Sequence, residues 1–247
     1  MSLDLLRFEN LSRVPGIVHA ISTRSGGVSR NRCASLNVSY SVGDDVDNVN
    51  ENLRRLSDGV GTQRERLFVA YQVHGRDVTL VEPDSDPQPR CDVLITRSPE
   101  QTLMLRYADC TPVLLADTKR GAVAAVHAGW RGSAVRAAGA AVTALADAFG
   151  SDPKDLVAGI GPAIGPCCYG VGQDVADAFA DRPWLISDNK LDLWEANRQA
   201  LVESGIPTDN IEVAGICTQC ESERFFSHRA NRGQPAGRFA ALIGLAC

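Results

Sequence analysis

Short apolar runs separated by polar turns dominate the chain, and the clearest example lies near its middle. Residues 112–116 and 122–126 are both apolar, and the polar turn between them ends at Gly121. This pattern predicts a β-hairpin. If residues 117–120 form the turn, counting outward from it places Leu115 opposite Ala122 and Cys110 opposite His127.

Similar patterns predict the rest of the secondary structure. Residues 47–59 carry apolar side chains at helical spacing and end at Gly59, and residues 133–149 form a helix that Ser133 caps and Gly150 ends. Two further helices are expected at residues 174–179 and 191–204. Strands are expected at residues 17–21, 68–73, 78–81, 91–95, 102–107, 156–160 and 211–216, with a last hairpin that pairs residues 225–229 with 237–243.

Composition narrows the class of protein. The chain has 247 residues, 44% of them hydrophobic, and a net charge of −5. That length can bury a large core, as one domain or as two, and no interdomain linker stands out. The charge balance and the lack of a Lys/Arg run argue against nucleic acid as a partner. With no apolar stretch near the ~18 residues of a membrane span and no secretory signal, a soluble cytoplasmic protein without membrane contact is expected.

The predicted pairing makes Cys110 and His127 the main candidates for chemistry. Opposite residues of an antiparallel pair have Cβ atoms about 5 Å apart, so the thiol and imidazole can share a metal ion or act as nucleophile and base. His74 is a third candidate, because it ends a predicted strand next to Gly75. His19, inside a strand, is expected to be structural.

Eight cysteines in a chain without a secretory signal are expected to be reduced thiols. Cys217 and Cys220 form a CxxC pair, which occurs in redox sites and as half of a zinc site. The adjacent Cys167 and Cys168 are the one candidate for a second half. A structural or inert role is expected for these four thiols rather than a second metal site.

Arginines are the candidates for binding an anion, because the chain has only three lysines. Arg131 directly precedes the helix predicted at residues 133–149, whose free amides favour phosphate, although a surface salt bridge would also explain this residue. Arg24 precedes Gly26 and Gly27, and this segment fits either an anion-binding nest or an ordinary hairpin turn. The Gly- and Pro-rich loop at residues 161–172 lacks the spacing of a dinucleotide fingerprint.

Several motifs, in this order, resemble one known family. They are Gln72-Val73-His74-Gly75, Ala108-Asp109-Cys110, His127-Ala-Gly-Trp-Arg-Gly132, Gly161-Pro-Ala-Ile-Gly165 and Phe225-Phe226-Ser227. The chain is similar to the bacterial YfiH-type proteins, also called laccase-domain, polyphenol oxidase or peptidoglycan-editing-factor proteins. The similarity extends from Thr23 to Arg238, which is nearly the whole chain.

The resemblance implies a single α+β domain over residues 1–247, with two mixed β-sheets packed between helices, similar to proteins assigned as cysteine hydrolases. It implies a zinc site made by His74, Cys110 and His127. It also implies phosphorolysis of adenosine, inosine, guanosine and methylthioadenosine, together with deamination of adenosine. Purine nucleosides and phosphate are therefore the expected partners, and the oligomeric state is left open.

The implied reaction assigns roles to further residues. Arg24, Arg131 and Arg229 are the candidates for holding phosphate, with Arg131 favoured by its place at a helix start, and Asn37 is a candidate for contacting substrate. Asp109 is expected either to assist the neighbouring metal ligands, as a partner or proton carrier, or to satisfy a turn.

The chain departs from the family pattern at a few positions. Glycine stands at position 170, where glutamate is usual, and Cys33 and His228 stand where tyrosine is common. Ala230 occupies a position that is usually arginine. None of these is one of the three metal ligands, so they bear on substrate preference rather than on the metal site.

Three other functions compete with the zinc enzyme. A multicopper oxidase needs on the order of ten histidines, and this chain has four, so copper is expected only as a substitute for zinc. Cys110 and His127 could instead form the nucleophile and base of a metal-free hydrolase. A non-catalytic protein that binds peptidoglycan precursors is the third alternative. Three protein ligands rather than four favour a catalytic metal over a structural one.

Overall fold

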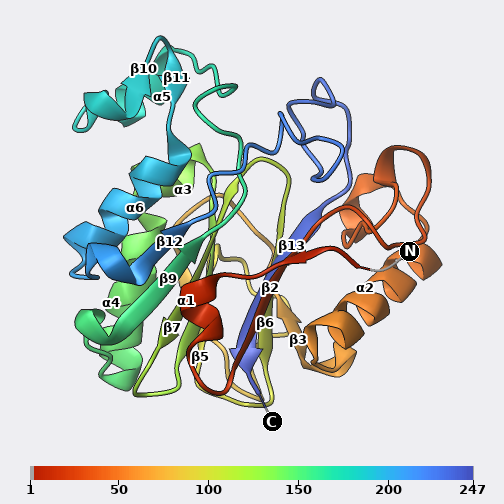
Figure 1. The fold of residues 1–247 in the computed structure, drawn as a ribbon, viewed down its shortest axis with the longest axis horizontal. Coiled ribbons are helices and arrows are strands. Elements are labelled where there is room, and N and C mark those ends of the chain that lie inside the picture. The colour runs from red at the N-terminus through yellow and green to blue at the C-terminus, as the bar shows by residue number, and fades with distance from the viewer. Residues whose placement is uncertain (1–2, 247) are drawn as a thin grey trace.

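The computed structural model describes residues 3–246. Two large β-sheets, of five and six strands, pack face to face, and helices cover both outer faces (Figure 1). The predicted fold class, α+β with two mixed sheets between helices, is confirmed. No helix within the described range is long and apolar enough to cross a membrane.

The five-stranded sheet has its last strand at its centre. Its order is β1-β2-β13-β6-β3, and the central strand pairs antiparallel with both of its neighbours. Strand β3 lies at one edge of the sheet and pairs parallel with β6. The strands are β1 (Leu5–Leu6), β2 (Ile17–Ser22), β3 (Leu67–Val69), β6 (Thr102–Tyr107) and β13 (Phe239–Leu245).

The six-stranded sheet is built around two strands buried along their whole length. Its order is β12-β9-β7-β8-β5-β4. Burial on both faces explains why its central strands are continuous apolar runs rather than alternating ones. The strands are β4 (Val78–Leu80), β5 (Val93–Thr96), β7 (Thr111–Asp117), β8 (Val123–Ala128), β9 (Leu156–Ile160) and β12 (Ile211–Val213).

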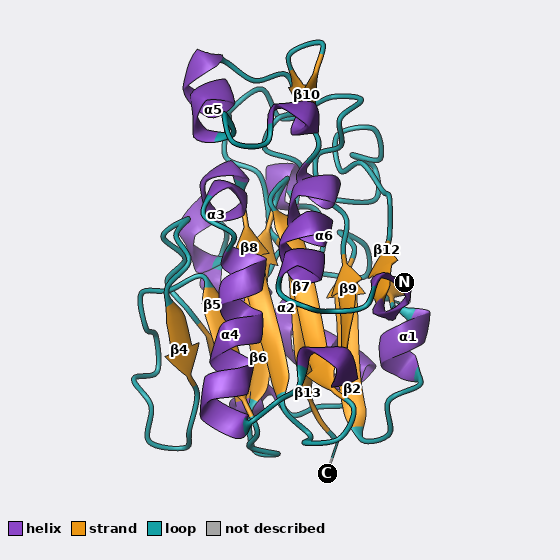
Figure 2. Ribbon diagram, turned by 90° about the vertical axis from the view of Figure 1, so that its left-hand side faces the viewer, coloured by secondary structure: helices purple, strands orange, loops and turns teal. Residues whose placement is uncertain are grey.

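Helices complete a four-layer arrangement. Helices α4 (Ala137–Phe149) and α6 (Leu193–Glu203) pack on the outer face of the six-stranded sheet, as Figure 2 shows. Helix α2 (Val46–Val60) packs on the outer face of the five-stranded sheet through Val49, Leu53 and Leu56. The main core between the sheets joins residues of both, including Tyr107 and Leu114.

A smaller group of elements projects beyond one end of the sheets (Figures 1 and 2). It contains α5 (Gln173–Ala178) and the two-stranded sheet of β10 (Ile186–Ser187) and β11 (Lys190–Leu191). These elements share a separate apolar cluster with the start of α6. The remaining helices are α1 (Glu9–Ser12), α3 (Trp130–Ala134) and the 3₁₀ segments Asn31–Cys33, Tyr40–Val42, Arg64–Arg66, Pro153–Asp155, Pro183–Leu185 and Thr208–Asn210.

The hairpin predicted at the centre of the chain forms with a different register. Strands β7 and β8 pair Leu115 with Ala124 and Pro112 with His127, so the predicted pairing of Cys110 with His127 is wrong by two residues. The cause is Asp117. Its carboxylate accepts hydrogen bonds from the amides of Lys119 and Arg120, and its own amide donates to the Ala122 carbonyl, which keeps Asp117 in the strand. Gly121, with φ of +64°, completes the turn at residues 118–121.

Other boundaries also differ from prediction. Helix α2 is capped by the Asp45 carboxylate and ends at Gly61, where φ is +86°, rather than at Gly59. The helix expected at residues 133–149 is two helices, because Arg136 adopts a left-handed conformation with φ of +57°. Residues 225–229 form no strand, since β13 already has β2 and β6 on its two edges.

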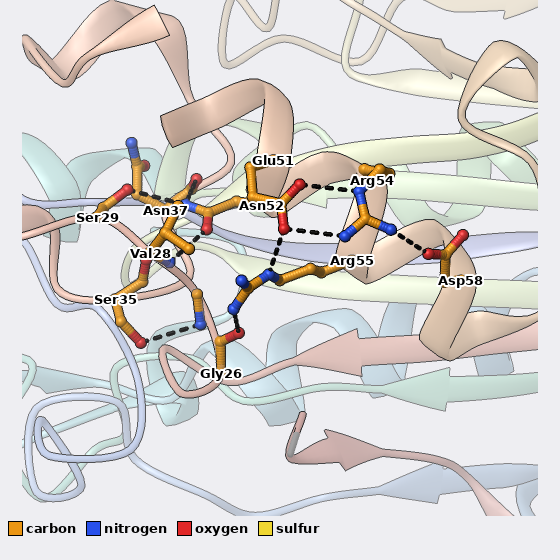
Figure 3. A network of polar contacts seen from close by, with 11 residues as sticks. Gly26, Val28, Ser29, Ser35, Asn37, Glu51, Asn52, Arg54, Arg55 and Asp58 are labelled. Carbon is orange, nitrogen blue, oxygen red and sulfur yellow. Dashed lines mark hydrogen bonds and ion pairs between the residues drawn. The ribbon is translucent and has the colours of Figure 1, made fainter. Parts of the chain in front are cut away.

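Helix α2 holds the segment that precedes it through a buried amide (Figure 3). The Asn52 side chain is fully buried, donates to Ser29 Oγ and to the carbonyls of Ser35 and Asn37, and accepts from the Val28 amide. A single side chain therefore fixes four points of the loop at residues 28–37.

Candidate metal and nucleoside site

The three predicted ligands meet in space. The ligand atoms of His74, Cys110 and His127 all lie within 4.8 Å of one another. The two imidazole rings stand edge to face, with centroids 4.9 Å apart. His74 lies in the loop after β3, Cys110 between β6 and β7, and His127 within β8. The register change does not prevent this convergence, because a slip of two residues keeps a side chain on the same face of the sheet.

Cys110 lies where the chain passes from one sheet to the other. Strand β6 belongs to the five-stranded sheet and β7 to the six-stranded sheet, and only three residues connect them. Asp109 takes a φ of +89° in this sharp connection. Its carboxylate accepts hydrogen bonds from Thr218 Oγ1 and from the Arg229 amide, each at 2.7 Å. Asp109 therefore ties this connection to the loop that follows β12.

Gly129 makes room for the Cys110 thiol. A Cβ atom at position 129 would lie 2.9 Å from Cys110 Sγ and 3.4 Å from His74 Cδ2. The distance to the sulfur is too short for a van der Waals contact, so any side chain at position 129 would displace the thiol. Glycine in the His-Ala-Gly-Trp-Arg motif is thus required by the packing of the site.

His127 is oriented by a carboxylate that the sequence analysis did not single out. Asp92 is fully buried, and its Oδ1 lies 2.7 Å from His127 Nδ1. Its other oxygen accepts hydrogen bonds from the amides of Val73 and Gly75, at 3.1 and 2.6 Å. Asp92 thus fixes both the ring of His127 and the backbone around His74. The one local signal for this role is an acidic residue in the otherwise apolar run at residues 91–95.

The charges of these groups are strongly coupled. Burial raises the pKa of Asp92, but hydrogen bonds from His127 and from the Gly75 amide outweigh it and lower this pKa. Burial likewise opposes ionisation of Cys110, yet the charge and hydrogen bonds of His127 and His74 lower the pKa of the thiol to about 6. For His127, burial is outweighed by Cys110 and Asp92, which raise its pKa to about 9. The site thus stabilises a thiolate, the form that binds metals and attacks electrophiles.

The three groups open into a cavity of about 940 Å³. Aromatic side chains of Trp130 and Tyr169 line it, and the guanidinium groups of Arg131 and Arg229 lie over these rings at 4.1 and 5.2 Å. Asp109 and the exposed His228 also contribute to the lining. Arg131 and Arg229, two of the predicted anion-binding residues, thus reach the same cavity as His74, Cys110 and His127.

Two further arginines line the cavity and were missed by the sequence analysis. Arg106, on β6, donates to the Ala70 carbonyl, and Arg238 donates to the carbonyls of Ala236 and Gly237. Neither makes an ion pair with a carboxylate among residues 3–246. Burial lowers the pKa of both, and the charge of Arg238 lowers that of Arg106 further. Two neighbouring half-buried cations, neither of them in an ion pair within residues 3–246, are an environment that a bound anion would stabilise.

The structure does not bring Arg24 or Asn37 to the cavity lining. The Arg24 guanidinium donates to the carbonyls of Ala34 and Ser222 and lies over the Phe226 ring. Asn37 is fully buried, and its Oδ1 accepts from the Arg238 amide. Both residues support the loops around the cavity.

The glycine pair after Arg24 forms no free anion nest. The Gly27 amide donates to Ser35 Oγ, and the Val28 amide donates to Asn52 Oδ1. A Cβ at position 27 would lie 2.1 Å from the Ser35 carbonyl oxygen, so this glycine allows two backbone segments to pack together. His19 is structural, as predicted, because its Nε2 accepts the Phe8 amide at 2.9 Å.

The donor set fits a single metal ion. Two imidazoles and a thiolate are ligands that zinc and copper both accept, and a carboxylate on the second nitrogen of His127 is a common feature of metal-bound histidines. The arrangement of Cys110, His127 and Asp92 also matches a metal-free nucleophile, base and orienting acid. The geometry therefore supports both kinds of chemistry.

Comparison with known proteins identifies the family. The family described as "Multi-copper polyphenol oxidoreductase laccase" matches residues 18–246. The purine nucleoside phosphorylase YlmD of Geobacillus stearothermophilus is 38% identical over 93% of this chain and 90% of its own length. The purine nucleoside phosphorylase YfiH of Escherichia coli is 34% identical over 93% of this chain and 94% of its own.

Solved structures agree with this assignment. The hypothetical protein YfiH of Bacillus licheniformis superposes with a TM-score of 0.89 at 34% identity, covering 99% of this chain and 96% of its own. The YlmD structure from Geobacillus stearothermophilus also gives a TM-score of 0.89, at 35% identity, with 98% and 96% covered. Sequence, motifs and fold thus lead to one conclusion: the chain belongs to the YfiH family of laccase-domain proteins.

Proposed function

We propose that this protein is a zinc-dependent purine nucleoside phosphorylase of the cytoplasm. The observation that carries the proposal is that a candidate metal site and a candidate anion site line the same cavity. His74, Cys110 and His127 line this cavity together with the half-buried cations of Arg106 and Arg238. Relatives at 31–38% identity that carry the name purine nucleoside phosphorylase support it.

The metal would be held by His74, Cys110 and His127, with Asp92 fixing the ring of His127. Three protein ligands leave a position for water or substrate, as in catalytic zinc sites. When bound there, zinc would act as a Lewis acid and lower the pKa of a coordinated water. Zinc is favoured over a blue-copper arrangement, because no methionine is among the residues that line the cavity.

The cavity suits a nucleoside together with phosphate. Its volume of about 940 Å³ lies in the range of small-molecule sites, and Trp130 and Tyr169 offer aromatic faces for a purine. Arg106 and Arg238 would bind the phosphate oxygens, assisted by Arg131 and Arg229 at the more open side. Arg24 and Asn37 would act only through the loops that they hold.

In the proposed reaction a phosphate oxygen forms a bond to C1′ of the ribose. The bond from C1′ to the purine nitrogen breaks, its electron pair leaves with the base, and the base takes up a proton. The arginines hold the nucleophile in place and offset its charge, which is the main contribution that protein groups make when charged reactants must meet. Asp109 is placed at the cavity wall to keep the Arg229 backbone in position.

The substrate range is the finer part of the proposal. Adenosine, inosine, guanosine and methylthioadenosine would all present a purine to the same aromatic walls. Deamination of adenosine would use the same cavity, with water in place of phosphate attacking C6 and ammonia leaving. The arginines would not be needed for that second reaction, so the two activities are separable.

The test is chromatographic analysis of products from inosine and adenosine, with and without phosphate. We expect hypoxanthine and ribose 1-phosphate from inosine only when phosphate is present. Replacing Arg106→Gln should raise the KM for phosphate by roughly 10- to 100-fold, the value of a charged hydrogen bond, while leaving adenosine deamination largely intact. Arg120→Gln, at the exposed turn between β7 and β8, is the matched control.

Absence of free base from every purine nucleoside, at any phosphate concentration and with zinc bound, would contradict the phosphorylase proposal. A KM for phosphate that does not change in the Arg106 variant would contradict the assigned anion site.

A metal-free hydrolase is the second candidate, because Cys110, His127 and Asp92 are arranged as nucleophile, base and orienting acid. Peptide-mapped alkylation distinguishes the two. As a metal ligand, Cys110 should react slowly until a chelator is added, in parallel with loss of activity. Rapid alkylation of Cys110, with and without chelator, would favour the hydrolase.

A further inference from the structure

We propose that the protein contains a second metal site, a structural zinc bound by four cysteines. These residues are Cys167, Cys168, Cys217 and Cys220, here called the four-cysteine cluster. Nothing in the proposed phosphorylase reaction requires this site. It differs from the inert role expected from the sequence, because the structure brings both pairs of thiols to one point.

The distances fit a tetrahedral ion. The four sulfur atoms lie within 4.8 Å of one another, and Cys220 Sγ lies 3.6 Å from Cys167 Sγ and 3.4 Å from Cys168 Sγ. Zinc–thiolate bonds of about 2.3 Å place the sulfurs of a tetrahedral site about 3.8 Å apart. Small side-chain rotations of the four cysteines therefore suffice to surround one ion.

The donor chemistry selects a soft metal. Four thiols with no carboxylate or imidazole among them form the Cys₄ set of structural zinc sites. Cys220 lies at nearly equal distances from two adjacent cysteines, so the geometry favours a shared central atom over one particular disulfide. All four thiols are free in the structure.

Backbone amides support the charge that a bound metal requires. The Gly165 amide donates to Cys217 Sγ at 3.3 Å. A hydrogen bond from an amide stabilises a thiolate, the form of cysteine that binds metals. A metal ion bound at the cluster would displace the thiol protons, because cysteine binds metals as the thiolate.

The cluster joins two loops that both line the substrate cavity. One loop follows β9 and contributes Ile164 and Tyr169, and the other follows β12 and contributes Arg229. Backbone hydrogen bonds join the two loops directly near Ala163. Beyond the cluster the loops separate, since the first pairs with β11 at Gly170 and the second hydrogen-bonds Arg24 through the Arg224 carbonyl. A zinc ion here would crosslink the cavity walls, as a closed four-ligand site does.

Metal analysis of the protein, purified under reducing conditions without added metal, tests the proposal. We expect two zinc ions per chain. The variant His74→Ala/Cys110→Ala/His127→Ala should keep one zinc, and adding Cys217→Ser/Cys220→Ser should remove it. Cys33→Ser/Cys91→Ser, at two buried cysteines outside the cluster, is the matched control and should leave the zinc content unchanged.

Cobalt gives an independent readout. After exchange of cobalt into the triple alanine variant, four thiolate ligands should produce intense visible absorption and a thiolate-to-cobalt charge-transfer band. Circular dichroism shows whether Cys217→Ser/Cys220→Ser folds. If it does not, Cys167→Ser/Cys168→Ser replaces it, and this variant should fold because its two side chains are exposed or half-buried. It should abolish the same cobalt signals.

Three results would overturn the four-cysteine site. The first is a triple alanine variant that holds no metal although its cluster thiols are free. The second is recovery of the cluster cysteines as disulfides, and the third is iron with inorganic sulfide at the cluster in place of zinc. Because the triple alanine variant lacks the proposed catalytic ligands, its zinc content is independent of whether the phosphorylase proposal holds.

Discussion

At the scale of single residues, the site depends on a carboxylate that touches no solvent. Asp92 serves His127 through one oxygen and the amides of Val73 and Gly75 through the other. One buried side chain therefore positions two of the three proposed metal ligands. It acts through them, so it is a positioning residue rather than a catalytic one.

Replacing Asp92→Asn should weaken zinc binding at the His74, Cys110 and His127 site. Partners of metal-bound histidines are typically worth about 10- to 100-fold in metal affinity, and we expect a loss of that size. Competition with a chromophoric chelator measures the zinc Kd. Asp84→Asn, on the exposed loop at residues 83–89, is the control, and equal affinities in both variants would contradict the role of Asp92.

The convergence of His74, Cys110 and His127 could be predicted from the sequence, but the residues that surround them could not. Cys110 directly precedes β7 and His127 lies on β8, and a short turn joins these two strands, so local pattern was enough to bring the two residues together even with the register wrong by two residues. Asp92 and Arg238 reach the site from other segments of the chain, and Arg106, although only four residues before Cys110, lies on a strand of the other sheet from His127. Their roles follow from how the sheets pack, which no local pattern encodes.

At the scale of elements, helix α2 acts as a support for the loop before it. Asn52 is fully buried and makes all of its contacts with that loop, while Glu51, Arg54 and Asp58 form ion pairs on the exposed side (Figure 3). Apolar spacing alone predicted the helix within two residues at each end. The buried amide within it was not anticipated, because an asparagine at one position of a helix is usually solvated.

Replacing Asn52→Ala should lower the free energy of unfolding by about 2–4 kcal/mol, since it leaves several buried hydrogen-bonding groups of the loop without partners. Urea unfolding followed by circular dichroism measures this. Asn48→Ala, one turn earlier on the same helix and not fully buried, should cost well under half as much. Similar losses in the two variants would show that Asn52 matters only as a helix residue.

The failed predictions of elements have physical causes as well. Residues 225–229 were expected to pair with residues 237–243, but both edges of β13 are occupied, so Phe225 and Phe226 enter the core from a loop instead. The helix at residues 133–149 breaks at Arg136, although nothing in its local sequence disfavours a helix there. In both cases tertiary packing overrides local preference.

At the scale of the whole molecule, the two sheets meet around buried polar groups whose charge state affects stability. His19 lies on β2 under α1 and accepts the Phe8 amide. Burial, and then the charge of Arg7, lower its pKa to about 4. In the unfolded chain a histidine has a pKa near 6.5, so the unfolded state takes up a proton first as the pH falls.

The contribution of His19 should therefore be complete above pH 6.5 and decline as the pH falls toward 4. Each pKa unit corresponds to about 1.4 kcal/mol, so the wild-type protein should lose about 2 kcal/mol more than His19→Gln between pH 7 and pH 5. Urea unfolding of both proteins at the two pH values gives this difference directly. Parallel losses in the two proteins would contradict the prediction.

The central place of β13 has a consequence for biosynthesis. This strand fills the gap between β2 and β6, more than 200 residues after β2 in the chain, as the adjacent red and blue ribbons of Figure 1 show. Until residue 245 has left the ribosome, both of those strands keep an unpaired edge, which is a template for aggregation. The five-stranded sheet can therefore close only after residues 239–245 have left the ribosome, and a nascent chain of this protein should depend on chaperones more than its stability would suggest.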